Sequence, residues 1–89
     1  MLVKAKFKVI NVKGIHARPS AELVKLTAKY KSEIRFGNGH FEVNGKSLLE
    51  VMKLGVTRNG TLHVKANGED AKKLVSAIQR LVEVDNFNE

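Results

Sequence analysis

The chain has 89 residues, no cysteine and a hydrophobic fraction of 43%. A chain of this length buries only a little over ~60% of the surface that its unfolded form exposes, so we expect one small domain over residues 1–89 with a modest core. The lack of cysteine excludes disulfide frameworks and thiolate metal sites. Sixteen lysines and arginines against nine acidic residues give a formal net charge of +7. This charge favours acidic partners without choosing between nucleic acid, membrane surfaces and acidic proteins.

The hydropathy pattern argues against membrane insertion and secretion. No apolar run approaches the ~20 residues that a membrane-spanning helix needs. The first nine residues alternate in polarity instead of forming the apolar block of a signal peptide. We therefore expect a cytoplasmic protein.

The first third of the chain predicts a strand, a loop and a helix. Residues 2–9 alternate between apolar side chains and lysines, which indicates a half-buried strand. Residues 11–16 form a loop, and helical spacing then extends over residues 17–29. The apolar stripe of this helix is predicted to run through Ala21, Val24 and Ala28, with Leu23 and Leu26 beside it.

The middle of the chain predicts two short strands joined by a turn. The strands lie around residues 34–36 and 41–43, and the Gly-Asn-Gly-His run at residues 37–40 supplies the turn, because glycine and asparagine tolerate positive φ. The alternation predicts that three phenylalanines face the core: Phe7, Phe36 and Phe41.

The last part of the chain predicts a short helix, a strand and a longer helix. Residues 47–53 form the short helix, and residues 62–66 alternate as the last strand. The final helix begins near Asp70 and keeps apolar residues at helical spacing as far as Val82. The order β-α-β-β-α-β-α implies a sheet with helices on its apolar face and water on the other. This is an open-faced α/β sandwich of the α+β class.

Residues 14–20, with the sequence Gly-Ile-His-Ala-Arg-Pro-Ser, place His16 just before a predicted helix. If His16 is the N-cap, Ala17 and Arg18 offer the first two free backbone amides, and Pro19 loses no helical hydrogen bond. The helix start favours an anion, and a guanidinium can hold two phosphate oxygens at once. The motif therefore favours a phosphoryl group on the imidazole of His16. An ordinary loop before a helix, with a solvated arginine, has the same local pattern.

A second motif, Ser47-x-x-Glu50, is a capping box. The serine side chain is predicted to accept the backbone N–H of Glu50, while the Glu50 carboxylate reaches back to the serine N–H. Leu48 and Leu49 are adjacent, and a short helix cannot bury both of them fully. At least one is predicted to lie exposed as part of an apolar patch, which protein surfaces rarely keep without a function.

The run from Gly14 to Ser20 resembles the active site of HPr, the histidine-containing phosphocarrier family of the bacterial phosphoenolpyruvate:sugar phosphotransferase system. The resemblance covers about residues 3–84 and implies an HPr-like open-faced β-sandwich, with a four-stranded antiparallel sheet and three helices on one face. It implies that His16 accepts a phosphoryl group on Nδ1 from enzyme I and passes it to enzyme II A domains for sugar uptake. Arg18 would support the phosphate. Ser20 stands where the family usually has alanine or another small residue.

The run from Lys46 to Gly55 resembles the HPr segment around a regulatory serine. The resemblance implies that Ser47 is a substrate of a serine-directed HPr kinase/phosphorylase in those bacteria that have this enzyme. It also implies that an apolar patch contacts enzyme I and enzyme II partners, although core packing is the alternative for each of its members, Leu48, Leu49 and Met52. Three lysines are expected to add a basic rim that meets acidic partner faces: Lys25, Lys46 and Lys53.

Other functions remain as alternatives. An HPr paralogue in a nitrogen-related or regulatory phosphotransfer chain would share the motif. A small basic nucleic-acid-binding domain could use the outward row of Lys4, Lys6 and Lys8, but no outward aromatic pair is predicted for base stacking, so we expect no nucleic acid. An autonomous enzyme would need a second catalytic base or a metal site, whereas His40 and His63 are expected at the surface without partners at metal-ligand spacing. We expect a monomeric carrier, not an enzyme, without metal or cofactor.

Overall fold

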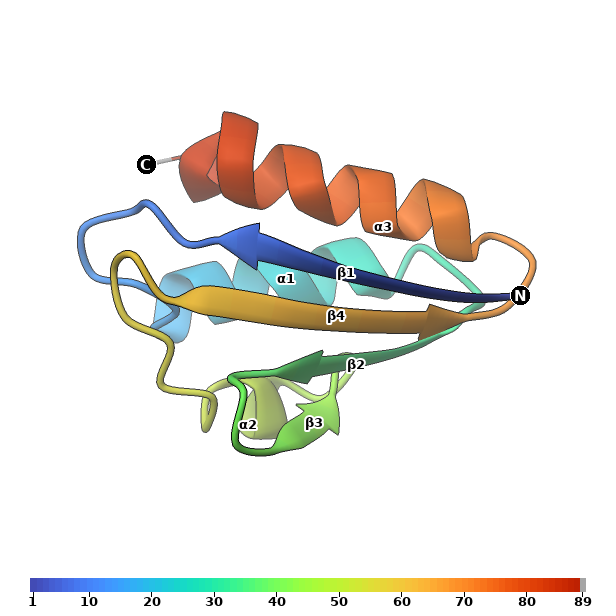
Figure 1. Cartoon of the computed structure of the whole chain (residues 1–89), viewed down its shortest axis with the longest axis horizontal. Coiled ribbons are helices and arrows are strands. Elements are labelled where there is room, and N and C mark those ends of the chain that lie inside the picture. The colour runs from blue at the N-terminus through green and yellow to red at the C-terminus, as the bar shows by residue number, and fades with distance from the viewer. Residues whose placement is uncertain (89) are drawn as a thin grey trace.

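The computed structural model describes residues 1–88 and alternates strands with helices in the predicted order (Figure 1). The strands are β1 (Leu2–Lys8), β2 (Glu33–Gly37), β3 (Glu42–Asn44) and β4 (Thr61–Asn67). The helices are α1 (Ala17–Thr27), α2 (Leu48–Val51) and α3 (Ala71–Gln79), after which come a π-helical segment (Arg80–Val84) and a 3₁₀ turn (Asn86–Asn88).

The four strands form one antiparallel sheet in the order β1-β4-β2-β3. Helices α1 and α2 lie behind this sheet in the view of Figure 1, and α3 packs along β1 and β4. The other face of the sheet carries no helix (Figure 1). This is the predicted open-faced sandwich, and the long alternating stretch at the N-terminus is indeed a strand. Within residues 1–88, no helix combines the length and apolar character needed to cross a membrane.

The core lies between the sheet and the helices, on the apolar face that the alternation predicted. In β4, Leu62, Val64 and Ala66 are at most 3% exposed, and Phe36 of β2 lies directly opposite Val64. Phe7 of β1 lies opposite Leu62 in the same way. Helix α3 covers this layer with its buried residues, which follow the predicted helical spacing: Ala71, Leu74, Val75 and Ile78.

Two predictions about burial are wrong. Phe41 is 47% exposed, because it precedes β3 at the free edge of the sheet, where no further strand or helix covers it. In α1, Ala21 and Ala28 are exposed, while the buried residues are Pro19, Ser20, Leu23 and Thr27. The Thr27 hydroxyl donates to the carbonyl of Gly45 at 2.8 Å, so a polar side chain is satisfied inside the fold. The stripe that hydropathy alone predicts is therefore displaced around the helix from the face that is buried in the structure.

Asp70 fastens the start of α3 to the segment before β2. Its carboxylate accepts the N–H of Lys31 at 2.9 Å, the N–H of Ser32 at 3.0 Å and the hydroxyl of Ser32. These hydrogen bonds, with the Ser32 hydroxyl first and the Lys31 N–H next, favour the ionised carboxylate and lower the pKa of Asp70 below its ordinary value.

Replacing Asp70 with asparagine is expected to flatten the acid limb of the stability curve. A folded-state pKa below the unfolded value means that the stabilisation is fully present above the unfolded pKa, near ~3.9, and is lost as the pH falls through the folded pKa. Urea unfolding midpoints measured between about pH 6 and pH 2 should therefore decline more steeply for the wild type than for Asp70→Asn. Parallel curves for the two proteins would contradict this role of Asp70.

Candidate functional site

His16 lies at the start of α1, as predicted. It is the N-cap residue, with an extended backbone at φ −116° and ψ −160°, and the helix begins at Ala17. The N–H of Ser20 donates to the His16 carbonyl at 2.9 Å and closes the first helical turn. The amides of Ala17 and Arg18 precede this bond and have no acceptor within the helix. Pro19 completes the turn without an N–H, so the motif opens the helix instead of breaking it.

The charges around the helix start favour an anion. None of the first-turn residues of α1 is acidic, so nothing in that turn offsets the positive end of the helix dipole. His16 is half-buried and Arg18 is exposed, so solvent and a partner protein can reach the guanidinium. An anion at this helix start would therefore meet backbone N–H donors, and the exposed cation of Arg18 belongs to the same turn.

The loop before His16 is held by hydrogen bonds, which set the position of the histidine. The N–H of Ile15 donates to the carbonyl of Val56 at 2.8 Å, which joins the loop after β1 to the segment before β4, and these run side by side in Figure 1. Inside the loop, the Asn11 side-chain amide donates to the Gly14 carbonyl at 2.6 Å. Gly14 has φ +69°, and a Cβ there would overlap the Val56 carbonyl oxygen and lie 2.8 Å from the Cα of Thr57.

Asn11 holds the loop before His16, a role that we did not predict from the sequence. Its side chain is fully buried, and the N–H of Gly14 donates back to its carbonyl at 3.1 Å. An asparagine three residues before a glycine is a common turn signal, and it was available in the sequence. The loop also exposes apolar surface, since Val12 is 73% and Ile10 is 41% exposed. No periodic pattern marks these two side chains.

Ser47 caps α2, but only half of the predicted capping box forms. The Ser47 hydroxyl oxygen accepts the N–H of Glu50 at 3.3 Å. The Glu50 carboxylate instead accepts the N–H of Asn44 at 3.0 Å. The N–H of Ser47 already donates to the Asn44 carbonyl at 3.1 Å, because the chain turns there between β3 and α2. Glu50 therefore fastens the end of β3 to the helix.

The three residues predicted to form an apolar patch are all exposed: Leu48 by 40%, Leu49 by 77% and Met52 by 45%. Val51 and Leu54 supply the buried side of this short segment. Helix α2 packs against α1, the helix that begins at His16. The patch therefore lies in the helical layer that carries the histidine, away from the open face of the sheet.

The three lysines predicted as a basic rim are all exposed, and two of them lie toward the far end of α1. The Lys46 ammonium donates to the carbonyl of Tyr30 at 2.7 Å. Tyr30 lies beyond the C-terminal end of α1, whose eleven residues give a length of about 16 Å. Lys25 occupies the last turn of α1, and Lys53 follows α2. Lys25 and Lys46 therefore lie toward the end of α1 that is opposite to His16.

The remaining histidines lie elsewhere. His40 is exposed in the turn before β3, and His63 is half-buried in β4, where it lines a hollow on the open face of the sheet. Across residues 1–88, no group of three or more histidine, cysteine or acidic residues is placed to hold a metal ion.

Comparisons with known proteins agree with this architecture. A family model described as the PTS HPr component phosphorylation site matches residues 3–84. The phosphocarrier protein HPr of Xylella fastidiosa is 33% identical over 88 residues, which cover 99% of this chain and 98% of that protein. The crystal structure of HPr-C-His from Thermoanaerobacter tengcongensis superposes with a TM-score of 0.91 at 31% identity, covering 98% of this chain and 97% of that one.

A longer kind of protein also matches. The multiphosphoryl transfer protein of Haemophilus influenzae is 39% identical over 83 residues, and the matched segment covers 90% of this chain but only 17% of that protein. These results place this chain in the class of phosphocarriers, proteins that carry a phosphoryl group. Within that class, the chain belongs to the HPr family of the phosphotransferase system.

Proposed function

We propose that His16 accepts a phosphoryl group from phosphoenolpyruvate-charged enzyme I and passes it to enzyme II A domains for sugar uptake. The observation that carries this proposal is the placement of His16 as the N-cap of α1, with Ala17 and the exposed Arg18 as the first two residues of the helix. Phosphoryl transfer needs little beyond positioning and electrostatic stabilisation of the transferred group. The helix start and the arginine supply both.

The transfer step has a simple balance. The lone pair of the neutral imidazole, on Nδ1 as in other HPr proteins, attacks the phosphorus atom of the phosphoryl donor. The bond between phosphorus and the donor breaks, and its electron pair stays with the donor group. The product is an N–P bond on His16, with the phosphoryl oxygens facing the helix start. This bond is labile, so the group can move on to an acceptor nucleophile by the same reaction.

The proposal is tested by phosphorylating the protein with phosphoenolpyruvate, Mg²⁺ and enzyme I, and following the intact mass. We expect one added phosphoryl group that is lost in acid, is stable in alkali and maps to His16. Addition of enzyme II A domains from sugar-specific and nitrogen-related branches then identifies the acceptor by loss of this label. Absence of label with the cognate enzyme I, on folded protein, would refute the carrier function of this chain.

Replacing Arg18 with glutamine is expected to lower kcat/KM for phosphoryl uptake by about ten- to a hundredfold, the usual contribution of hydrogen bonds to a charged group. Arg18→Lys should fall in between, because lysine keeps the charge but not the planar fork. Arg80→Gln removes the same charge from an exposed arginine beyond α3 and is the matched control. Equal rates for Arg18→Gln and Arg80→Gln would show that Arg18 does not hold the phosphate.

The exposed apolar patch of Leu48, Leu49 and Met52 is proposed as the docking surface for enzyme I and the A domains. A well-exposed leucine contributes little to the fold, so its retention on α2 needs another reason. The lysines along α1 and next to α2, Lys25, Lys46 and Lys53, would steer acidic partner faces toward this patch.

Leu49→Ala and Leu54→Ala make a matched pair for this surface. Leu49 is 77% exposed and Leu54 is 2% exposed. Leu49→Ala should leave the free energy of unfolding within about 0.5 kcal/mol of the wild type, yet raise the KM for enzyme I by about fivefold or more. Leu54→Ala should cost about 2–5 kcal/mol of stability. An unchanged KM for Leu49→Ala, measured in steady-state transfer, would remove Leu49 from the docking surface.

Ser47 is proposed as a second phosphorylation site, used by a serine-directed HPr kinase/phosphorylase. Its hydroxyl already lies at the start of α2, where it accepts the N–H of Glu50. A phosphate there would gain backbone N–H donors but would approach the Glu50 carboxylate. Incubation with the kinase and ATP should give an acid-stable label that is absent from Ser47→Ala. Lack of any such label would leave Ser47 with the capping role alone.

A further inference from the structure

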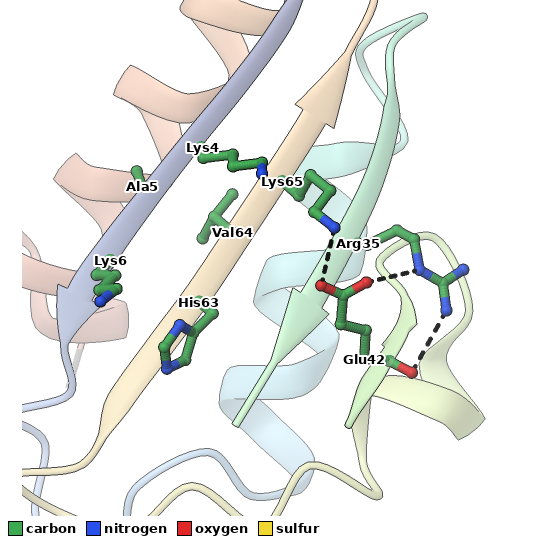
Figure 2. A pocket seen from close by; sticks show the side chains of 8 residues that line it. All are labelled: Lys4, Ala5, Lys6, Arg35, Glu42, His63, Val64 and Lys65. Atoms are coloured by element: carbon green, nitrogen blue, oxygen red, sulfur yellow. Dashed lines mark hydrogen bonds and ion pairs between the residues drawn. The ribbon is translucent and has the colours of Figure 1, made fainter. Parts of the chain in front are cut away.

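Positively charged side chains gather on the open face of the sheet, which is opposite to the helical layer. Lys4 and Lys6 of β1, Lys65 of β4 and Arg35 of β2 all lie on this face (Figure 2). Together with His63 and Glu42 they line a hollow of about 340 Å³. Neither the docking patch on α2 nor the start of α1 uses this surface, since both belong to the layer behind the sheet (Figure 1).

The cations face one another across the strands. Lys4 lies directly opposite Lys65, and Lys65 lies directly opposite Arg35, so three positive side chains form one row across β1, β4 and β2. Like charges at directly opposed positions destabilise a sheet. The fold therefore keeps an arrangement that opposes its own stability.

A single acid offsets this row only in part. Of the residues that line the hollow, Glu42 alone is acidic. Its carboxylate lies 3.1 Å from the Lys65 ammonium and 3.5 Å from the Arg35 guanidinium, as Figure 2 shows. The hydrogen bond from Lys65 is the main reason that the pKa of Glu42 is lowered, so the group is anionic at neutral pH. Among residues 1–88, no acid forms an ion pair with Lys4 or Lys6.

We propose that this row is a binding site for a small polyphosphate, meaning a ligand with two or more linked phosphate groups. Neighbouring strands are about 4.8 Å apart and alternate residues of one strand about 6.8 Å apart. One phosphate can thus reach two of these cations, while linked phosphates can span Lys4, Lys65 and Arg35 together. Ammonium and guanidinium groups are the usual protein donors to phosphate.

The size and the lining of the hollow favour a small ligand over nucleic acid. A volume of about 340 Å³ is at the lower end of the range for small-molecule sites. No phenylalanine, tyrosine or tryptophan lines it, whereas single-stranded nucleic acid is usually held by stacking on aromatic rings. Because the site and the helical layer are on opposite faces, bound polyphosphate leaves the surface around His16 accessible.

The test is a titration with inorganic triphosphate, followed by amide chemical shifts at constant ionic strength and without metal ions. We expect shifts at Lys4, Lys6, Arg35 and Lys65, and weaker binding of orthophosphate at the same residues. Lys4→Gln and Lys65→Gln should each weaken triphosphate binding by about two- to fivefold, the factor that an exposed ion pair contributes. Lys72→Gln removes the same charge from an exposed position on α3 and should not change the affinity.

One further variant, and a second measurement on Lys4→Gln, should give results that a purely structural role would not produce. Glu42→Gln removes the competing carboxylate and should tighten triphosphate binding by a similar factor. Lys4→Gln should weaken binding and yet raise the midpoint of thermal unfolding slightly, because it relieves the repulsion by Lys65.

Three outcomes would overturn the proposal. The first is a set of shifts confined to residues 16–18, which would place the anion at the helix start. The second is an equal affinity for Lys4→Gln, Lys72→Gln and the wild type. The third is an oligonucleotide that binds the row more tightly than triphosphate at the same phosphate concentration, which would identify a nucleic-acid surface instead.

Discussion

Replacing His16 with alanine should abolish phosphoryl uptake from enzyme I, with no label above background in the intact mass. The expected loss is complete because alanine has no nucleophile and the Ala17 and Arg18 amides can only orient a phosphoryl group, not accept it. Other residues around the helix start cannot substitute for the imidazole, since the Arg18 guanidinium is not a nucleophile, Pro19 has no reactive group and the Ser20 hydroxyl is fully buried. Residual labelling on a second residue of the variant would contradict the assignment.

The other two histidines make the control specific. His40 is exposed in a turn, and His63 is half-buried on the open face of the sheet. His40→Ala and His63→Ala should each accept the phosphoryl group at the wild-type rate. Thermal unfolding of all three variants separates loss of the nucleophile from loss of the fold. If His63→Ala also lost the label while it remained folded, the open face would have to take part in the transfer.

The sequence was sufficient for the parts of the fold in which one repeating pattern decides the structure. The alternation in β1 and β4 and the helical spacing in α3 each extend over several residues, and each side of these elements has one environment. The start of α1 was equally predictable, because His16, Arg18 and Pro19 combine capping and first-turn chemistry.

The sequence was insufficient where single contacts decide the structure. Phe41 fits the alternation but lies at an uncovered edge, and only the strand order reveals that. Thr27 is buried because a carbonyl eighteen residues away accepts its hydroxyl. Phe87 is fully buried although it follows α3 and the π-helical segment, and it reaches the core through a turn in which residues 86–88 all have positive φ. A pattern of local hydropathy contains none of this information.

In the candidate site, too, local patterns were predictable from the sequence and contacts between distant segments were not. The sequence predicted that His16 and Arg18 lie at the start of α1, and it predicted at least one exposed leucine on α2, because two adjacent leucines cannot share one narrow buried stripe. It did not predict what holds His16 in place, since the hydrogen bond from Ile15 to Val56 joins two loops that lie far apart in the chain. The cation row was also hidden, because its members come from three strands and oppose one another only in the observed register.

Replacing Gly14 with alanine is expected to damage both the fold and the position of His16. At φ +69° an L-residue is strained by about 1–2 kcal/mol. The new Cβ would also overlap the Val56 carbonyl oxygen, which accepts the N–H of Ile15. Overpacking of this kind costs about 1–3 kcal/mol. We expect a total loss near 3 kcal/mol in urea unfolding, a large part of the stability of a small domain.

Gly55→Ala separates the two causes of this loss. Gly55 has a similar φ of +63°, but a Cβ there would have no neighbour within 4 Å. The variant should therefore show only the backbone strain, about 1 kcal/mol, and should transfer phosphoryl groups normally. Gly14→Ala should lose transfer even under conditions in which it is folded, because the overlap displaces the loop that ends at His16. Equal losses of stability in the two variants would mean that the backbone around Val56 can move away from the new Cβ at no cost in free energy. The hydrogen bond between Ile15 and Val56 would then not fix the position of the histidine.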